Sequence, residues 1–455
     1  MPIKSINPYN YEILAEFEEY SDQKIERALI LADKSFREWK KTSFNTRRAL
    51  MLNCAELLED RIDQLAETIT LEMGKVISES RAEIKKCAWV CQYYADNAER
   101  FLEDEKLDVT EAESFLVYDP IGIVLAIMPW NFPFWQVFRF AAPGLMSGNV
   151  GILKHASNVP QCALAIEGVF KEAGFPDGVF QSLIIGSEKV NKIIDDPRVK
   201  AVTLTGSDIA GRKVAERAGK NLKKLVLELG GSDPFIVLED ADVKAAVSIA
   251  VKARMINCGQ SCIAAKRFIL EELIYEEFIN EFNNAFTALI GGDPLSEKVD
   301  YGPLAREDLV FEISHQVDTS VNLGARVLLG GERLDWNSNF YKPTILTNVK
   351  PGMPGFDEEL FGPVASVIEV KNAEEAINIA NTSRFGLGAS LWTQDLDIAS
   401  NLAREIETGA VFVNAMVASN PKVPFGGIKD SGYGRELSYL GIREFMNAKS
   451  IWISN

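Results

Sequence analysis

The sequence predicts an α/β protein with parallel sheets and crossover helices, and three observations carry this prediction. Short apolar segments at 121–127, 150–154, 181–186 and 201–206 are each followed by small or polar residues and then by a helical pattern. Strands that are apolar throughout are buried on both faces, as in parallel sheets covered by helices. A length of 455 residues exceeds one simple core, so two or three lobes are expected.

The first hundred residues favour helices. Ser21 is a candidate N-cap for a segment whose apolar residues repeat at helical spacing over 25–36. Further helical patterns cover roughly 45–74 and 79–103, and Gly74 is expected to stop the first of them.

A second αβ series runs from about residue 235 to residue 411. Its strand candidates are 235–238, 266–270, 364–370 and 410–413. Two further strand candidates, 114–118 and 448–453, lie outside both series. The C-terminal one has no partner nearby in the sequence, so we expect it to pair with another subunit.

Composition restricts the class of partner. The net charge of −17 argues against nucleic acid or an anionic membrane and favours a soluble, cytoplasmic protein. The first residues lack the apolar core of a signal peptide, and the most apolar stretch, 121–130, is about half the length that spans a bilayer. An anionic substrate would therefore need local positive charge in its pocket.

Cysteine and histidine usage limits the possible chemistry. The six cysteines are scattered, which indicates reduced thiols rather than a disulfide framework. Cys87 and Cys91 have the spacing of half a metal site, but with only two histidines in the chain buried structural thiols are favoured and no metal is expected. An activated nucleophile must then use a base other than histidine.

Two segments offer a nucleophile and a base. Cys262 ends the segment GQSC, and a thiol adds readily to carbonyls and forms a thioester that is easily attacked. Glu228 ends an apolar run just before Gly230 and Gly231, where a desolvated carboxylate could act as a general base. Taken singly, the cysteine could be a packing residue and the glutamate a capping or ion-paired one.

A third segment offers an oxyanion donor. Asn131 lies in the segment PWNFP at the junction of a strand and a helix, where its amide could donate to a developing negative charge. The alternative is that Asn131 is an N-cap residue.

These segments and four others occur in the order seen in aldehyde dehydrogenases, and the chain resembles that family over essentially its whole length. The matching segments are PWNFP at 129–133, Lys154, TGS at 205–207, ELGG at 228–231, GQSC at 259–262, EELFGP at 358–363 and PFGG at 424–427. The resemblance implies a Rossmann-like parallel-sheet cofactor domain at 1–104 and 121–231 and a second α/β catalytic domain at 232–431. It also implies a small β oligomerisation element at 105–120 and 432–455, and hence a homodimer or homotetramer.

The resemblance also implies a mechanism. Cys262 attacks the aldehyde, and the oxyanion of the thiohemiacetal lies between the Asn131 amide and the Cys262 N–H. Hydride transfer to nicotinamide leaves a thioester, and Glu228 activates the water that hydrolyses it. Related enzymes that acylate coenzyme A lack this glutamate, so Glu228 argues for release of a free acid.

By the same resemblance, the cofactor is expected to be NADP, with NAD as a weaker alternative. Members that prefer NAD often carry glutamate three residues after the lysine that matches Lys154, whereas this chain has Ser157. Serine removes a charge that would repel a 2′-phosphate, and Lys154 adds a positive one. The alternative is that Ser157 is neutral and tolerates both cofactors.

Six further residues are assigned to the cofactor. Ser207 opens a helical segment whose N-terminus suits the pyrophosphate. The family match places the others along the cofactor path and around the nicotinamide and its ribose: Met128, Trp130, Leu229, Glu359 and Phe361.

The substrate is expected to carry a carboxylate. Asn131, Trp135 and Arg139 are spaced four apart and would share one helical face, and the planar fork of an arginine suits a carboxylate. The alternative for Arg139 is an exposed, ion-paired residue. Arg139 and Ser419 match residues of bacterial succinate-semialdehyde dehydrogenases, and Ser261 beside the nucleophile completes the substrate set.

We therefore predict oxidation of succinate semialdehyde to succinate. Glutarate semialdehyde is the nearest alternative, because one methylene is worth only about 1–3 kcal/mol in a pocket. The match is incomplete: the position of a second carboxylate-binding arginine is Ile256, with Arg254 displaced by two, and a regulatory cysteine is replaced by Ala264. A cofactor-independent thiol esterase is an alternative of another class, but Lys154 and Glu359 would then have no purpose.

Overall fold

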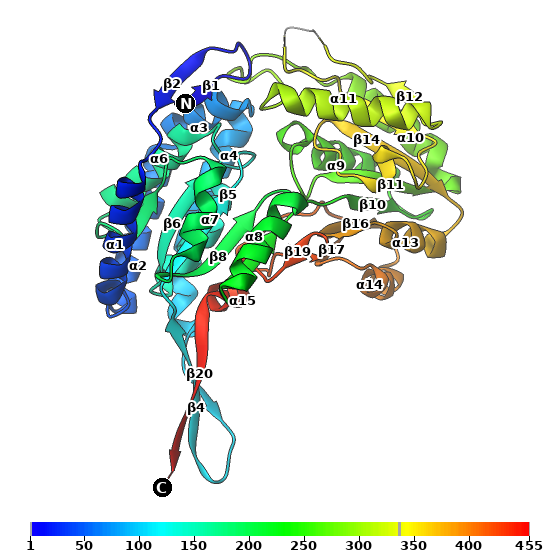
Figure 1. Ribbon diagram of the computed structural model, residues 1–455. Helices are drawn as coiled ribbons and strands as arrows, with labels where there is room; N and C mark the ends of the chain where they lie inside the picture. Colours follow the sequence, from blue (N-terminus) through cyan, green and yellow to red (C-terminus); the bar gives the residue numbers. More distant parts are fainter. Residues whose placement is uncertain (1, 335–337, 455) are drawn as a thin grey trace.

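The structure is a computed structural model that describes residues 2–334 and 338–454. Two lobes, each built on its own sheet, stand side by side, and a narrow arm extends away from them (Figure 1). The predicted α/β fold with parallel sheets is confirmed. Within the described residues, no helix combines the length and apolar character needed to cross a membrane.

The first lobe contains a six-stranded sheet whose order is β19-β9-β8-β5-β6-β7. Five strands are parallel, and the short β19 is antiparallel to β9. The strand bounds are Ile123–Met128 (β5), Val150–His155 (β6), Phe180–Ser182 (β7), Val199–Thr205 (β8), Lys224–Glu228 (β9) and Gly432–Tyr433 (β19). The apolar segments 121–127, 150–154 and 201–206 correspond to β5, β6 and β8, whereas the segment 181–186 lies in β7 only as far as Ser182.

Helices cover both faces of this sheet (Figure 1). The helices of this lobe are Asp22–Trp39 (α1), Phe44–Asp60 (α2), Ile62–Met73 (α3), Ile77–Phe101 (α4), Trp135–Met146 (α5), Pro160–Glu172 (α6), Val190–Asp195 (α7), Asp208–Lys220 (α8) and Ser438–Glu444 (α15). The lobe also contains a 3₁₀ turn at Ser187–Lys189 and a hairpin of the strands Ile3–Ile6 (β1) and Ile13–Phe17 (β2).

The helix boundaries follow local chemistry. The Ser21 side chain accepts from the Lys24 N–H at the start of α1, as predicted. Gly74 ends α3 with a φ of 81°, a conformation that glycine adopts without strain. The expected helix over 45–74 is broken at Arg61, whose ψ of 19° leaves the helical range. Neither glycine nor proline marks that break, so the apolar pattern could not reveal it.

The second lobe contains a seven-stranded sheet of order β12-β13-β14-β11-β10-β16-β17, parallel except for β12. Its strands are Asp233–Val237 (β10), Ala265–Glu271 (β11), Arg326–Leu329 (β12), Thr344–Thr347 (β13), Val364–Val370 (β14), Gly388–Trp392 (β16) and Ala410–Val413 (β17). Its helices are Val243–Met255 (α9), Glu272–Thr287 (α10), Glu307–Asn322 (α11), Pro354–Asp357 (α12), Ala373–Asn381 (α13) and Leu396–Glu405 (α14). Phe385–Gly386 (β15) pairs with Ile428–Lys429 (β18).

The arm consists of Glu105–Leu107 (β3), Ala112–Pro120 (β4) and Met446–Ser454 (β20). β20 is antiparallel to β4 along its whole length, from the pair Met446 and Pro120 to the pair Ser454 and Ala112. The C-terminal strand thus has a partner in its own chain that is distant in sequence, and because β20 is an edge strand, its pairing with another subunit stays a prediction. Pairing of segments more than three hundred residues apart is a tertiary event, which local sequence patterns do not show.

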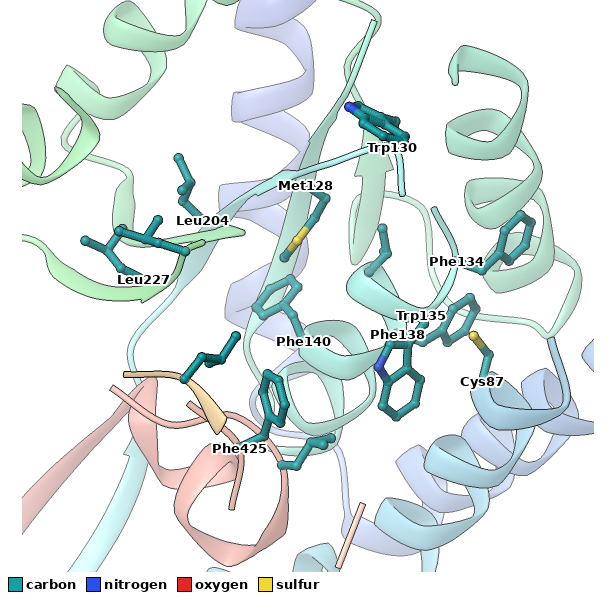
Figure 2. Packing of buried hydrophobic residues seen from close by; sticks show 14 of the residues in the cluster. Cys87, Met128, Trp130, Phe134, Trp135, Phe138, Phe140, Leu204, Leu227 and Phe425 are labelled. Atoms are coloured by element: carbon teal, nitrogen blue, oxygen red, sulfur yellow. The ribbon is translucent and has the colours of Figure 1, made fainter. Parts of the chain in front are cut away.

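Aromatic packing holds α5 between the sheet and α4. Every residue of α5 is buried. Phe138 stacks on Phe134 and on Phe170 of α6, with ring centroids 6.4 and 5.2 Å apart. Figure 2 shows Cys87 of α4 beside the aromatic side chains at the start of α5. This packing matters for function because it fixes the direction in which α5 presents Trp135 and Arg139.

Candidate active site

Cys262 lies in the loop between α9 and β11, and the backbone of this loop is strained. Asn257 and Cys258 have φ angles of 52° and 53°, in the left-handed region that residues other than glycine seldom occupy. Gly259 follows with a φ of 75°. Such a conformation persists only where its surroundings hold it, and it is concentrated at functional sites.

Buried hydrogen bonds hold the loop in place. Arg254 is fully buried and donates to the carbonyls of Gly259 and Ala265, at 2.6 and 2.9 Å. The Gln260 side chain donates to the Asn257 carbonyl at 3.1 Å. Arg254 thus supports the loop. It is displaced by two residues in the sequence from the position of a second carboxylate-binding arginine.

Two cavities meet at Cys262, which lines both of them. The smaller cavity, of about 260 Å³, is lined by α4, α5 and the loop that carries Ser419. It contains all four residues predicted for the substrate: Trp135, Arg139, Ser261 and Ser419. The larger cavity, of about 800 Å³, contains seven of the eight residues predicted for the cofactor: Met128, Trp130, Lys154, Ser207, Leu229, Glu359 and Phe361.

The Cys262 thiol is held in its neutral form by its surroundings. Burial raises its pKa to about 12, and the nearby cations Lys266 and Arg139 oppose that rise only in part. Lys266 donates to the carbonyls of Ser261 and Cys262, at 2.6 and 2.7 Å. Because the thiolate is the nucleophile, attack requires a change in the local charge or a proton acceptor.

Asn131 precedes α5 and does not lie on it. The expected helical face shared by Asn131, Trp135 and Arg139 is therefore wrong for Asn131, because α5 begins at Trp135 and its N-cap residue is Phe134. The Asn131 amide is buried and donates to the Gln260 carbonyl at 3.0 Å. An amide nitrogen carries two protons, so a second one remains for an oxyanion near Cys262.

Glu228 ends β9 and is 2% exposed. Within the described part of the chain, neither of its carboxyl oxygens has a hydrogen-bond partner, so the capping and ion-paired alternatives are not met. Burial raises the pKa of Glu228 well above its usual range, and the neighbouring Glu436 adds to the rise. The carboxyl packs near Gly426 and lines neither cavity.

Arg139 is buried rather than exposed, with 2% of its surface accessible. Its Nε forms an ion pair with Glu436, and Nη2 donates to Thr205 Oγ1 at 3.4 Å. The guanidinium carbon lies 4.6 Å from the centroid of the Phe425 ring. The alternative interpretation of Arg139 is thus wrong about exposure but correct about ion pairing.

The larger cavity contains features that suit an anionic ligand. Lys154 is buried, which lowers its pKa, and its ammonium has no hydrogen bond or ion pair with any described residue. The Ser207 side chain caps α8 by accepting from the Ala210 N–H, and Ser207 lines the cavity at this helix N-terminus. An unpaired ammonium and a helix N-terminus both favour negative charge, so the residues present fit a dinucleotide such as NADP.

Aromatic, hydrogen-bond and charge contacts join residues in another part of the larger cavity. Trp130 and Phe361 meet edge to face with ring centroids 5.7 Å apart. Glu359 accepts from the Gly231 N–H at 3.0 Å and lies 3.5 Å from the Lys266 ammonium. Ser157, the eighth residue predicted for the cofactor, is exposed and is not a lining residue of the cavity.

Sequence reasoning missed several polar residues of this site. Lys86 and Gln136 line the smaller cavity, Lys266 lies beneath the nucleophile, and Glu436 pairs with Arg139. Lys86 and Lys266 sit within apolar helix and strand patterns, where a lysine is normally read as a solvated residue. Glu436 reaches Arg139 across almost three hundred residues, so no local spacing could have linked the two.

Comparison with known proteins agrees with this site. The model of the aldehyde dehydrogenase family matches residues 1–451. The chain therefore belongs to the aldehyde dehydrogenase family. It is 51% identical over 454 residues to a probable succinate-semialdehyde dehydrogenase (NADP+) of Synechocystis sp., and the alignment covers all of both chains.

Two further relatives point in the same direction. Succinate-semialdehyde dehydrogenase (NADP+) 1 of Mycobacterium tuberculosis is 49% identical over 457 residues, again with both chains covered completely. Among solved structures, succinic semialdehyde dehydrogenase from Streptococcus pyogenes in complex with NADP+ matches with a TM-score of 0.98 and 38% identity over the whole of both chains.

Proposed function

We propose that this aldehyde dehydrogenase oxidises succinate semialdehyde to succinate with NADP. The observation that carries the proposal is that Cys262 lines both a small cavity with cationic side chains and a larger one that contains the unpaired Lys154 ammonium and the N-terminus of α8. Relatives named as NADP-dependent succinate-semialdehyde dehydrogenases, 49–51% identical over the full chain, support this choice of substrate and cofactor.

Each catalytic side chain has a defined task in this proposal. The Cys262 sulfur adds to the aldehyde carbon, and the Asn131 amide and the Cys262 N–H stabilise the oxyanion. NADP, when bound, supplies the nicotinamide that accepts the hydride. Glu228, as a carboxylate, takes a proton from the water that attacks the Cys262 thioester, and the C–S bond breaks to release succinate and the Cys262 thiol.

The remaining residues hold the ligands. Arg139, Ser419, Trp135 and Ser261 would hold the substrate, with the first two at its carboxylate. Lys154, Ser157 and Ser207 would hold the adenosine and phosphate part of NADP. Met128, Trp130, Leu229, Glu359 and Phe361 would hold the nicotinamide part.

We also propose the domain roles. The first lobe, 1–104 and 121–231, binds the cofactor, and the second, 232–431, carries the nucleophile. Residues 105–120 and 432–455 form the element that joins subunits into a homodimer or homotetramer, with β3, β4 and β20 as its projecting part. A reducing compartment such as the cytoplasm suits the enzyme, because its six cysteines are free thiols.

The test is a kcat/KM panel with succinate semialdehyde, glutarate semialdehyde and butanal, each with NADP and with NAD. We expect the highest value for succinate semialdehyde with NADP, measured as NADPH absorbance, and no dehydrogenation by Cys262→Ala. Full activity of that variant would exclude Cys262 as nucleophile. Ester cleavage without any cofactor reduction would instead identify a thiol esterase, and equal values for NAD and NADP would remove the NADP preference.

A further inference from the structure

The small cavity contains a cation that the proposed substrate set does not use. Lys86 projects from α4 and lines the same cavity as Cys262. Its ammonium donates to Ser419 Oγ at 2.8 Å and lies 4.3 Å from the centroid of the Trp135 ring. The Trp135 indole N–H donates to the same Ser419 oxygen at 2.9 Å. Lys86, Ser419 and Trp135 therefore form one connected polar cluster.

Lys86 differs from the other buried cations around this cavity in its lack of a counter-charge. Lys75 and Glu83 form a fully buried ion pair, and Arg139 is paired with Glu436. Glu79 accepts from the Asn257 N–H at 3.0 Å.

Across residues 2–334 and 338–454, no carboxylate lies within ion-pair distance of Lys86. A half-buried ammonium without a counter-charge is unfavourable, and a ligand carboxylate would relieve that penalty.

Resting on the proposed function, we propose that Lys86 is a specificity-determining residue that binds the carboxylate of the semialdehyde. Its ammonium and the Ser419 hydroxyl both face the cavity, so the two can donate to one carboxylate. Arg139 adds positive charge from the neighbouring turn of α5, while its own ion pair with Glu436 is kept. The aldehyde end of the substrate then points to Cys262. Cys262 and Gln136 each line both cavities.

A matched set of variants tests the proposal in the intact enzyme. Lys86→Met keeps the length of the side chain and removes its charge, Lys86→Arg keeps the charge, and Lys85→Met removes the charge of the exposed neighbour on α4. For each variant, kcat and KM are measured with succinate semialdehyde and with butanal, which has the same carbon chain but no carboxylate.

We expect Lys86→Met to raise KM for succinate semialdehyde by about 10- to 100-fold, the usual effect of losing a hydrogen bond to a charged group. Its kcat, and both constants for butanal, should stay within about twofold of the parent enzyme. Lys86→Arg should recover much of the loss, and Lys85→Met should have no effect. A rise in KM for butanal as large as that for succinate semialdehyde would contradict a role in carboxylate binding.

The outcomes separate this proposal from the proposed function. If the parent enzyme prefers succinate semialdehyde to butanal and Lys86→Met keeps that preference, the Lys86 proposal is wrong and the function stands. If the parent enzyme has no such preference, the proposed function itself fails. Unchanged melting temperatures would show that the variants are folded.

A pH profile supplies a second readout. Burial lowers the pKa of Lys86 to about 8, and the positive charge of Arg139 contributes to this effect. Cys87, Glu83 and Lys75 also face the ammonium, and the two acidic groups oppose the shift.

Lys86 therefore loses its charge as the pH rises through about 8. The kcat/KM for succinate semialdehyde divided by that for butanal should fall above this pH, and Lys86→Arg should make the ratio constant. The ratio cancels the ionisation of Cys262, which affects both substrates equally. A ratio in the parent enzyme that does not change between pH 7 and 9 would contradict the proposal.

Discussion

At the scale of single residues, the site contains two reactive groups whose burial disfavours their ionised forms. The Cys262 thiol and the Glu228 carboxyl both have raised pKa values because burial disfavours their charged forms. A neutral thiol is protected from oxidation, which proceeds through the thiolate. Glu228 can act as a base only as a carboxylate, the form that burial and the neighbouring Glu436 disfavour. The free enzyme is therefore a resting state of low reactivity.

This resting state predicts how the free enzyme reacts with iodoacetamide. Because the pKa of Cys262 is about 12, the thiolate fraction should rise about tenfold for each pH unit between pH 7 and 9, and the alkylation rate should rise with it. The rate is measured by mass spectrometry of the peptide that contains Cys262, and Cys262→Ser identifies the background from other cysteines. A rate that levels off near pH 8 would mean that the thiol ionises much more readily than its burial implies.

At the scale of elements, the strained loop between α9 and β11 determines the position of the Cys262 sulfur. Two successive residues in the left-handed region, followed by Gly259, turn the chain sharply before Cys262. Arg254 and Gln260 hold that turn from the interior. The sulfur is thus carried by a loop that internal hydrogen bonds hold in place.

A pair of glycine substitutions tests this rigidity. A Cβ on Gly259 would meet the Gly362 carbonyl, and its φ of 75° disfavours any L side chain, so Gly259→Ala should destabilise the fold by at least about 1–2 kcal/mol and lower kcat. Gly168 lies exposed within α6 with open space around it, so Gly168→Ala should stabilise the fold by about 0.5–1 kcal/mol. Chemical denaturation measures both. Equal effects of the two substitutions would show that the loop tolerates a side chain.

Elements are also the scale at which the sequence was most informative. Apolar runs predicted β5, β6 and β8, because a strand buried on both faces is mostly apolar, and the strand candidates of the second αβ series correspond to β10, β11, β14 and β17. The break between α2 and α3 at Arg61 was not predicted, because the helical spacing of apolar residues continues across it. Asn131 was placed on a helix because its spacing of four is helical, yet α5 begins four residues later.

The site was predictable where a motif carries its own chemistry. Cys262, Trp130 and Glu359 stand in local segments that match family patterns, and they line the cavities. Lys86 and Glu436 were missed because their effect arises from contacts between distant segments. Burial and pairing of charges are properties of the folded chain, and a linear pattern does not encode them.

At the scale of the whole molecule, the two lobes place the nucleophile between two cavities while the arm lies far from both. The six-stranded sheet and the seven-stranded sheet contribute different walls to the larger cavity, which runs from Lys154 on β6 to Phe361 before β14. The arm adds nothing to that site within one chain. Its exposed apolar residues, Ile451, Trp452 and Ile453, are 37%, 55% and 50% accessible and lie on β20. Such residues on a projecting strand favour contact with a second copy.

We therefore predict that residues of the arm contribute to the contact between subunits. Ile453→Asp places a charge on this apolar strand and should shift a homodimer or homotetramer toward smaller species, because a desolvated charge without a partner opposes association. Light scattering after size-exclusion chromatography measures the mass at several concentrations. Leu273→Asp, an exposed leucine on α10 that is 75% accessible, is the control and should leave the mass unchanged. A parent enzyme that stays monomeric at every concentration would refute the proposed role of the arm. If the oligomer persists in a variant with both Ile453→Asp and Trp452→Ala, the subunit contact lies on another surface.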